Sequence, residues 1–517
     1  MERANPTEYE PAAAQVGDAD TATIPRGTRR IHFVSDPSSI TANVLPDPVA
    51  VDDLKRLVDM IADSGADSFQ QDVYNKGCTV YWRSDEFQYD QRQQHRRFLP
   101  MLEAGTQPLQ VLLEHSHRRG MAFTAGFRMN DTHGGEHFPV RADFVESHPE
   151  WQLQDDRDGA GYNEGFPLDF TFDEVRDYVF RVMRELVKRF DVDGIEMTFR
   201  DPVYFPFPEG RKRAHLMSDL VRRLRVMLDE HSKVRGRRIQ LGARVFSTLD
   251  ECLDMGLDVP EWIAAGLLDY LSPMDTMFCD FNAEYEEFGA LTRRSSCMLY
   301  PTLNQWTSRR MRMSGGGMSP SNCRALAQTF YGAGADGLTI YAPVAGFMRS
   351  PPFFPQTLQV LHELRDPARV ARGDRHYVFD PTWEGETAFG QDRCTTGVVK
   401  AMRVVLERSA AKPSGEYLFR LYERMDRVRQ ATLLLRGSLT ARDELEVLLN
   451  GVSMAPGPLG QRNARFLEMA PALRWFPVPP DAMAYGQNKL TISLVEADPQ
   501  TSADIVVDEV ELWIQPK

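Results

Sequence analysis

Between Arg30 and about Asp366 the chain repeats one pattern, in which a short apolar run is followed by a helical stretch. Several of the helical stretches end in glycine, as helix C-caps often do. Eight such units predict a (β/α)8 barrel, or TIM barrel, with insertions. The strand candidates are RIHFVSD (30–36), DSFQQDVY (67–74), AFTAGFRMN (122–130), GIEMTFR (194–200), IQLGARVF (239–246), DYLSPMDT (269–276), CMLYPTL (297–303) and DGLTIYAP (336–343).

An open, doubly wound α/β sheet is the competing fold. That fold requires a glycine-rich phosphate-binding turn after its first strand, and SDPSSI (35–40) is not such a turn. The barrel is therefore favoured. The loop that follows the third strand candidate, from Asn130 to about Phe172, is long, and loops of this length are usually functional.

After about Gly373 the pattern changes to strands with apolar residues at every second position, separated by turn signals such as Asn-Gly. This second pattern predicts a C-terminal β-sandwich. The boundary is placed in the run ELRDPARVARGDRHY (363–377), and the first residues are polar and alanine-rich, which is typical of a disordered arm. The predicted division is an N-terminal arm (1–28), a barrel (29–370) and a sandwich (371–517).

Composition narrows the function and the compartment. The formal net charge of -14 argues against a general nucleic-acid-binding protein, and no apolar run is long enough for a membrane span. The N-terminal residues lack the apolar core of a secretory signal, so a cytoplasmic location is expected, with secretion after removal of a signal as the alternative. The six cysteines are scattered without a Cys-x-x-Cys pair, which favours free, buried thiols in a reducing compartment.

The fourth strand candidate carries the clearest chemical signal. Side chains of a strand alternate between its two faces, so Ile195 and Met197 point one way while Glu196, Thr198 and Arg200 point the other. A buried carboxylate is costly unless it is paired or used. Glu196 is therefore the first candidate for catalysis.

Other polar residues end the remaining strands, and the carboxyl ends of barrel strands meet over one opening. The amino ends of the same strands are apolar or plain by comparison. This asymmetry predicts an active face at the carboxyl ends. The residues expected there are Asp36, Gln70, Asp72, Tyr74, Arg128, Asn130, Asp131, His133, Glu196, Thr198, Arg200, Arg244, Asp275, Asn304, Trp306 and Tyr341.

Two carboxylates from different strands are what cleavage of a glycosidic bond requires. We predict Glu196 and Asp275 as the catalytic pair, with Asp36, Asp72 and Asp131 as rivals for the second place. The alternative for Glu196 is a purely structural ion pair with one of the nearby arginines. These arginines would favour the ionised carboxylate, and they could grip an acidic group of the substrate. The predicted substrate-binding residues are Asp36, Asp72, Arg128, Asn130, Asp131, His133, Arg200, Arg244, Asn304, Trp306 and Tyr341.

The sequence gives weaker signals for a metal or cofactor site than for cleavage of a glycosidic bond. His133 and His137 lie near Asp131 and Glu136 in the long loop and could form a metal site, but the first strand has a single histidine rather than the His-x-His of barrel metallohydrolases. No cofactor and no metal are therefore expected.

The run DGIEMTFRDP (193–202) resembles the fourth-strand signature of the glycoside-hydrolase-like family-10 barrels. Further segments fit the same group, and the resemblance covers roughly residues 30–345. It implies a barrel that acts on glycans, often with a trailing β-sandwich, and it places Asp193, Glu196 and Arg200 in the signature. The chain departs from the family at Thr198, where many relatives carry Asp. The other matching segments are FRMNDTH (127–133), FVESHPEW (144–151), LDFTFDEVRDYVF (168–180), YLSPMDT (270–276) and GADGLTIY (334–341).

The predicted function is that of a glycoside hydrolase with a carbohydrate as its partner. A glycan-binding protein with a degenerate barrel is one alternative, supported by Thr198, and a lyase or other hydrolase of uronate-containing sugars is another. The same run is similar to the chitinase Asp-Gly-x-Asp-x-Asp-x-Glu motif, but Arg200 replaces its final Glu, so a chitinase mechanism is not expected. The sandwich is expected to support the barrel, with sugar binding or a homodimer contact as further roles.

Overall fold

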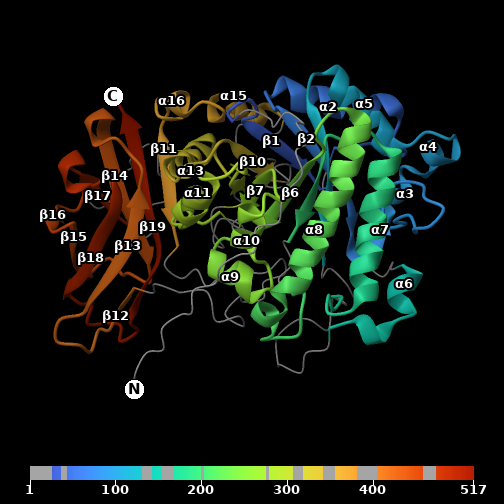
Figure 1. Ribbon diagram of the computed structural model, residues 1–517. Helices are drawn as coiled ribbons and strands as arrows, with labels where there is room; N and C mark the ends of the chain where they lie inside the picture. Colours follow the sequence, from blue (N-terminus) through green and yellow to red (C-terminus); the bar gives the residue numbers. More distant parts are fainter. Residues whose placement is uncertain are drawn as a thin grey trace.

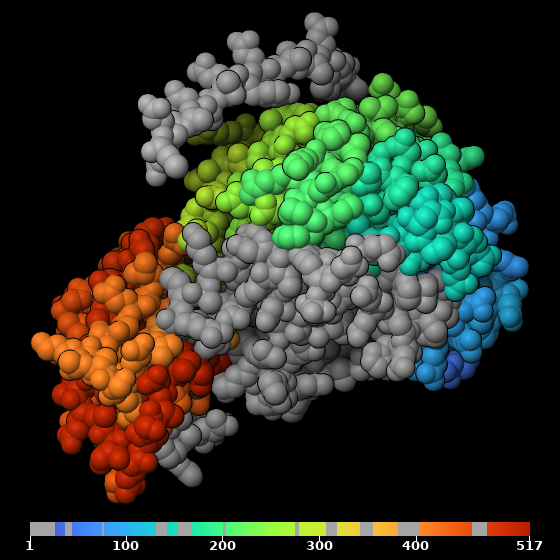
Figure 2. Space-filling model, turned by 90° about the horizontal axis from the view of Figure 1, so that it is seen from below, coloured from blue at the N-terminus to red at the C-terminus, as the bar shows by residue number. Residues whose placement is uncertain are grey.

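The computed structural model of the chain describes residues 26–36, 44–130, 142–153, 167–199, 203–274, 279–304, 306, 318–341, 355–380, 404–457 and 473–517. Two bodies stand side by side in it (Figure 1). One is a parallel sheet surrounded by helices, and the other is a pair of antiparallel sheets near the C-terminus. Figure 2 shows the same arrangement from below, with the antiparallel body in orange and red.

The parallel sheet closes on itself through one interrupted strand. Its path runs β8-β7-β6-β5-β4-β2-β1-β10-β9, and only Tyr300 and Pro301 separate β8 from β9. Because β8 pairs with β7 while β9 pairs with β10, the two pieces form one strand that joins both edges. The strands are β1 (Ile31–Ser35), β2 (Ser68–Asn75), β4 (Ala122–Arg128), β5 (Gly194–Thr198), β6 (Gln240–Val245), β7 (Tyr270–Pro273), β8 (Met298–Leu299), β9 (Thr302–Leu303) and β10 (Leu338–Tyr341).

The interruption has a local cause, because proline lacks the N–H that a strand donates to its neighbour. Tyr300 N donates to Leu271 O at 2.8 Å on one side, and Pro301 O accepts from Thr339 N at 3.0 Å on the other. The chain thus bonds both neighbours across the break. All eight predicted strands are confirmed, and so is the predicted (β/α)8 barrel.

Helices cover the outside of this barrel (Figure 1). In α7 the fully buried residues Val175, Val179, Val182 and Leu186 recur three and four residues apart, which forms one apolar stripe on the helix. This stripe accounts for the docking of the helix on the strands. The helices of the barrel are α2 (Val51–Asp63), α5 (Pro108–Arg118), α7 (Asp173–Arg189), α8 (Gly210–Arg235), α9 (Leu249–Asp254), α10 (Val259–Ala264), α11 (Glu286–Thr292), α13 (Pro320–Gly332), α15 (Leu361–Leu364) and α16 (Pro367–Val370).

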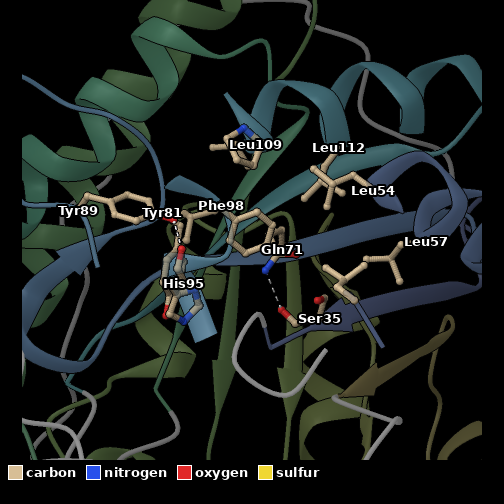
Figure 3. A pocket seen from close by; sticks show the side chains of 13 residues that line it. Ser35, Leu54, Leu57, Gln71, Tyr81, Tyr89, His95, Phe98, Leu109 and Leu112 are labelled. Atoms are coloured by element: carbon tan, nitrogen blue, oxygen red, sulfur yellow. Dashed lines mark hydrogen bonds between the residues drawn. The ribbon is translucent and has the colours of Figure 1, made fainter. Parts of the chain in front are cut away.

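Short elements after β2 and β4 form local insertions. A cavity of about 40 Å³ lies between the outer face of β1 and β2 and the helices α2 and α5, and Figure 3 shows leucines of both helices facing Ser35 and Gln71. Ser35 and Gln71 thus face a mainly apolar lining, to which Tyr81, Tyr89 and His95 also contribute. The inserted elements are β3 (Thr79–Val80), α3 (Gln93–Arg96) and α4 (Leu99–Glu103) after β2, and α6 (Asp143–Glu146) after β4, with 3-10 turns η1 (Lys76–Cys78) and η3 (Pro149–Trp151).

The C-terminal body is a sandwich of two antiparallel sheets. One sheet has the order β11-β19-β14-β17 with β12 beside β19, and the other has the order β13-β18-β15-β16. The sandwich is thereby confirmed. Its strands are β11 (Arg375–Phe379), β12 (Val405–Leu406), β13 (Ser414–Leu421), β14 (Val428–Gly437), β15 (Glu444–Leu449), β16 (Val452–Met454), β17 (Leu473–Val478), β18 (Gly486–Glu496) and β19 (Ile505–Pro516), and its 3-10 turns are η7 (Met425–Arg427) and η8 (Pro480–Ala482).

The sandwich docks on the barrel through β13 and β11. Asn282 bonds β13 in both directions, donating to Leu418 O at 2.9 Å and accepting from Arg420 N at 3.0 Å. From α13, Gln328 Nε2 donates to Tyr422 O at 2.7 Å. The two bodies are therefore joined by specific polar contacts as well as by packing.

The cysteines behave as the sequence predicts. All of them except Cys394, which lies outside the described residues, are free and buried. Within the described residues, no helix is long and apolar enough to span a bilayer.

Candidate active site inside the barrel

The centre of the barrel holds a layer in which glycines make room for polar side chains. Asp72 pairs with Gly126, Gly126 with Glu196, and Glu196 with Gly242 across four neighbouring strands. A Cβ at Gly126 would overlap the carboxylate of Asp72 and the amide of Gln70, and one at Gly242 would overlap the ring of Tyr270. The absence of two side chains thus lets an acid, an amide and a phenol lie across the interior.

Glu196 lies at the centre of this layer and is fully buried. Its Oε1 atom is 2.7 Å from an Arg244 guanidinium nitrogen, and it accepts from Gln70 Nε2 at 2.9 Å and from Thr198 Oγ1 at 3.1 Å. Its Oε2 atom has no hydrogen-bond partner among the described residues. The ion pair with Arg244 stabilises the charged carboxylate, and one oxygen of that carboxylate is left to interact with something else.

Gln70 connects this carboxylate to Asp72. Its amide nitrogen also donates to Asp72 Oδ1 at 3.1 Å, so one NH2 group bridges two acids. Since that nitrogen donates to both acids, Gln70 Oε1 is the acceptor for His32 Nε2 at 2.8 Å. His32 Nδ1 then accepts from Ser68 Oγ at 2.6 Å. Ser68 and His32 thereby fix the orientation of the bridging amide.

Burial keeps His32 uncharged near neutral pH and shifts the titration of Asp72 into this range. Burial lowers the pKa of His32 to about 4, although Glu196 opposes the shift. Burial raises the pKa of Asp72 to about 7; Arg244 and Arg128 oppose that rise, and Asp36 adds to it. The Oδ2 atom of Asp72 has no hydrogen-bond partner within the described part of the chain. The site therefore holds one acid in contact with an arginine and a second acid that titrates near neutrality.

Two arginines and a tyrosine complete the described part of the site. The Arg244 guanidinium lies 4.8 Å from the ring centre of Tyr341 in a cation–π arrangement, and both residues are buried. Arg128, at the end of β4, is also buried and acts on Asp72 through its charge. The structure thus brings together the predicted residues Asp36, Asp72, Arg128, Glu196, Arg244 and Tyr341.

Asn130 makes contacts of a different kind. Its side chain donates to the backbone carbonyls of Leu168 and Val203 and accepts from Leu168 N at 2.8 Å. It therefore ties the loops that follow β4 and β5 together.

Two further predicted residues lie where β9 ends. The Asn304 backbone N–H donates to Cys279 Sγ at 2.9 Å, and the Trp306 carbonyl accepts from Cys279 N at 2.8 Å. These contacts hold this strand end against the segment after β7.

Four predicted site residues, Asp131, His133, Arg200 and Asp275, lie outside the described residues. The second predicted catalytic acid, Asp275, is one of them and stays a prediction. Within the described ranges, no group of three or more His, Cys, Asp or Glu side chains is arranged to hold a metal ion.

Sequence reasoning placed Gln70 at the active face without giving it a role, and it did not single out His32 or Gly126. The alternation along β1 and β2 places His32 and Gln70 on the inward faces, and this was the available signal for both. The role of Gly126 depends on where the Asp72 side chain lies, which sequence does not give.

The fold is that of a (β/α)8-barrel protein with a C-terminal β-sandwich. Residues 38–215 match the family model described as glycosyl hydrolase-like 10, which confirms the resemblance predicted from the sequence. A search of curated proteins finds no match.

Solved structures of similar fold are distant. A cycloisomaltooligosaccharide glucanotransferase from Paenibacillus sp. is 9% identical with a TM-score of 0.33, over 94% of this chain and 57% of that one. The PgaB (BpsB) glycoside hydrolase domain from Bordetella bronchiseptica is 14% identical (TM-score 0.40; 66% of this chain, 98% of that one). An α-amylase from Geobacillus thermoleovorans is 13% identical (TM-score 0.40; 91% and 99%). At such scores, the fold assignment rests on the strand pairing of this chain alone.

Proposed function

We propose that the protein is a glycoside hydrolase acting on an oligo- or polysaccharide, with Glu196 as its principal carboxylate. The observation that carries the proposal is the state of Glu196. It is fully buried and paired with Arg244, yet Oε2 has no hydrogen-bond partner among the described residues, and His32 Nε2 lies 3.9 Å from it. A buried polar atom without a partner is uncommon, and such atoms are concentrated at functional sites and ligand contacts.

The chemistry of the site supports the same function. The transition state of glycosidic cleavage is positively charged at the anomeric carbon, and an ionised carboxylate stabilises that charge or attacks the carbon. The ion pair with Arg244 suits Glu196 to this part rather than to proton donation. A second carboxyl group is needed to protonate the leaving oxygen, and Asp275 was the partner predicted from the sequence.

Product analysis on a panel of neutral and acidic glycans tests the proposal. The wild type is expected to release shorter glycans, detected by mass spectrometry. Glu196→Gln is expected to slow release by on the order of 10²–10⁴-fold while keeping a wild-type circular dichroism spectrum. Asp193→Asn, at the opposite end of β5, is the matched control and is expected to keep activity. Turnover that survives Glu196→Gln would contradict the proposal.

The same panel separates the alternatives. An acidic-sugar lyase would leave an unsaturated product that absorbs in the ultraviolet, whereas a hydrolase would not. Retained binding without cleavage by the wild type would favour a glycan-binding protein.

A further inference from the structure

We propose that Asp72, on β2, is the proton donor of this hydrolase and that Gln70 sets its position relative to Glu196. The inference rests on the function proposed above and deepens it, because it names the second catalytic residue from the described geometry. Asp72 is fully buried and lies next to Glu196 in the same layer of the barrel.

The separation of the two acids fits this assignment. Asp72 Oδ1 and Glu196 Oε1 accept from the same Gln70 nitrogen at 3.1 and 2.9 Å, so these two oxygens lie no more than about 6 Å apart. Enzymes that invert the anomeric centre hold their carboxyl groups about 6.5–9.5 Å apart to admit a water molecule, whereas retaining enzymes hold them about 5–5.5 Å apart. The bridged pair therefore fits the retaining mechanism, with Glu196 as the nucleophile.

The surroundings divide the two roles. Glu196 has the Arg244 guanidinium at 2.7 Å, which keeps it ionised. Asp72 has an uncharged amide as its hydrogen-bond donor, while Arg244, Arg128 and Asp36 act on it through their charges. Two acids with such different surroundings divide into a carboxylate and a proton donor. Gly126 supplies the space in which the Asp72 carboxyl lies.

The reaction balances in two steps. In the first, the Asp72 carboxyl gives its proton to the glycosidic oxygen, the bond from that oxygen to the anomeric carbon breaks, and Glu196 forms a bond to that carbon. In the second, the Asp72 carboxylate takes a proton from water, the water oxygen attacks the anomeric carbon, and the bond to Glu196 breaks. Both acids return to their starting states, and the anomeric configuration is retained.

Gln70 acts as a positioning residue. Its amide is held by His32, which is held in turn by Ser68, so one orientation presents both N–H groups to the acids. Replacing Gln70 with Glu removes the N–H bridge and adds a third carboxyl group beside the pair.

Aryl glycosides with leaving groups of different acidity test the assignment. A dinitrophenyl group departs without a proton, whereas a phenyl group requires one. Asp72→Asn is expected to release the dinitrophenyl group in the first step at close to the wild-type rate and the phenyl group on the order of 10²–10⁴-fold more slowly. The first step is measured as the pre-steady-state burst of phenol, because the second step also uses Asp72 and should slow with both substrates. Glu196→Gln should lose both activities, and Asp193→Asn should keep both. With the dinitrophenyl substrate, nuclear magnetic resonance should show retention at the anomeric carbon.

The outcomes separate this inference from the proposed function. If Glu196→Gln abolishes cleavage while Asp72→Asn affects the first-step release of both leaving groups equally or not at all, the proton-donor role is overturned and the hydrolase stands. If the wild type cleaves no glycoside, the proposed function fails and this inference fails with it. Infrared difference spectra between wild type and Asp72→Asn give a readout without substrate. A protonated carboxyl band is expected below pH 7 and not well above it, and absence of that band overturns the assignment.

Discussion

Two acids that share one hydrogen-bond donor differ in charge because of what else surrounds them. Glu196 has a guanidinium nitrogen 2.7 Å away and a threonine hydroxyl on the same oxygen. Asp72 is equally buried, and the shared amide donates its one side-chain hydrogen bond among the described residues. An opposite charge in contact favours the charged form of a carboxyl group. The contacts with Arg244 and Thr198 therefore distinguish Glu196 from Asp72.

The raised pKa of Asp72 makes a prediction about stability. In the unfolded chain the carboxyl ionises near its ordinary pKa of 3.8, whereas in the folded protein it holds its proton to about 7. At this group the folded state therefore binds more protons across the window, so the contribution of Asp72 to the stability of the wild type falls as the pH rises from about 4 to 7. Asp72→Asn removes this effect and should gain stability over the wild type, on the order of 4 kcal/mol above pH 7.

Urea unfolding of both proteins across this pH range measures the difference. His32 works in the opposite direction, because its pKa is lowered to about 4, but it is present in both proteins and cancels. A stability difference that does not change between pH 4 and 7 would contradict the prediction.

Gly126 gives a second prediction at the residue scale. Gly126→Ala places a methyl group where Asp72 and Gln70 now lie, and overpacking of this kind costs typically 1–3 kcal/mol. Gly242→Ala, in the same layer, should cost a similar amount by displacing the Tyr270 ring. Only Gly126→Ala should also disturb the protonated carboxyl band of Asp72. If Gly126→Ala has the same free energy of unfolding as the wild type, the space at Gly126 is not needed to accommodate Asp72 and Gln70.

The sequence could identify Glu196 but not how its neighbours divide the chemistry. Strand alternation placed Glu196, Arg244 and Asp72 on the inward face, because the alternation follows from backbone geometry alone. It could not show which arginine lies within contact distance, nor that a glycine on β4 lets Asp72 approach Glu196. Those facts depend on the strand register and on rotamers, which arise only when the barrel closes.

At the scale of elements, the layer between β1, β2 and the helices α2 and α5 contains a buried hydroxyl group, that of Ser35, which makes no hydrogen bond among the described residues. Ser35 points outward into the cavity of Figure 3. Burying a hydroxyl without a partner costs about 1–3 kcal/mol. The Ser35 hydroxyl therefore lowers the stability of the protein, and an apolar side chain at this position would avoid that cost.

Ser35→Ala should leave the free energy of unfolding unchanged or raise it by up to about 1 kcal/mol, because it removes a polar group that makes no bond. The matched control is Ser116→Ala on α5. Ser116 is equally buried, but its hydroxyl donates to Leu112 O at 2.8 Å, so the control should lose about 0.5–1.5 kcal/mol. Denaturant unfolding of the two variants gives the comparison. A loss for Ser35→Ala as large as that for Ser116→Ala would show that the Ser35 hydroxyl is bonded after all.

The element scale is where sequence reasoning succeeded best. All eight barrel strands lie where the alternation of apolar runs and helical stretches predicted them, because each βα unit must bury both faces of its strand. In the sandwich, the period-two pattern predicts strands over 400–408, 415–424, 430–437, 443–451, 488–496 and 504–515, and β11, β16 and β17 are not among them. β11 lies partly inside the run 363–377 that was expected to be a boundary, because its charged flanks resemble a linker while Tyr377 and Phe379 are buried by the partner strand and sheet. β16 has only three residues, too few for a periodic pattern.

At the scale of the whole molecule, barrel and sandwich are joined closely enough to unfold together. The Asn282 side chain forms two hydrogen bonds with the backbone of β13, and the Gln328 side chain donates a hydrogen bond to the backbone carbonyl of Tyr422. Behind Tyr422, α13 ends at Gly332, where a Cβ would overlap the tyrosine ring. The ring therefore packs directly on the helix backbone. A methyl group at position 332 would push the ring away from the helix.

Gly332→Ala tests that coupling, because two effects of opposite sign meet at this position. Alanine favours the helix by about 1 kcal/mol over glycine, whereas the overlap with Tyr422 should cost about 1–3 kcal/mol. We expect a net loss and a broader or divided transition in scanning calorimetry, as the sandwich loses part of its contact with α13. In a Tyr422→Gly background the overlap is gone, because the Cβ of residue 422 is removed together with the ring, so the same substitution should stabilise the protein. A gain from Gly332→Ala in both backgrounds would show that the ring does not press on the helix and that the two bodies are coupled elsewhere.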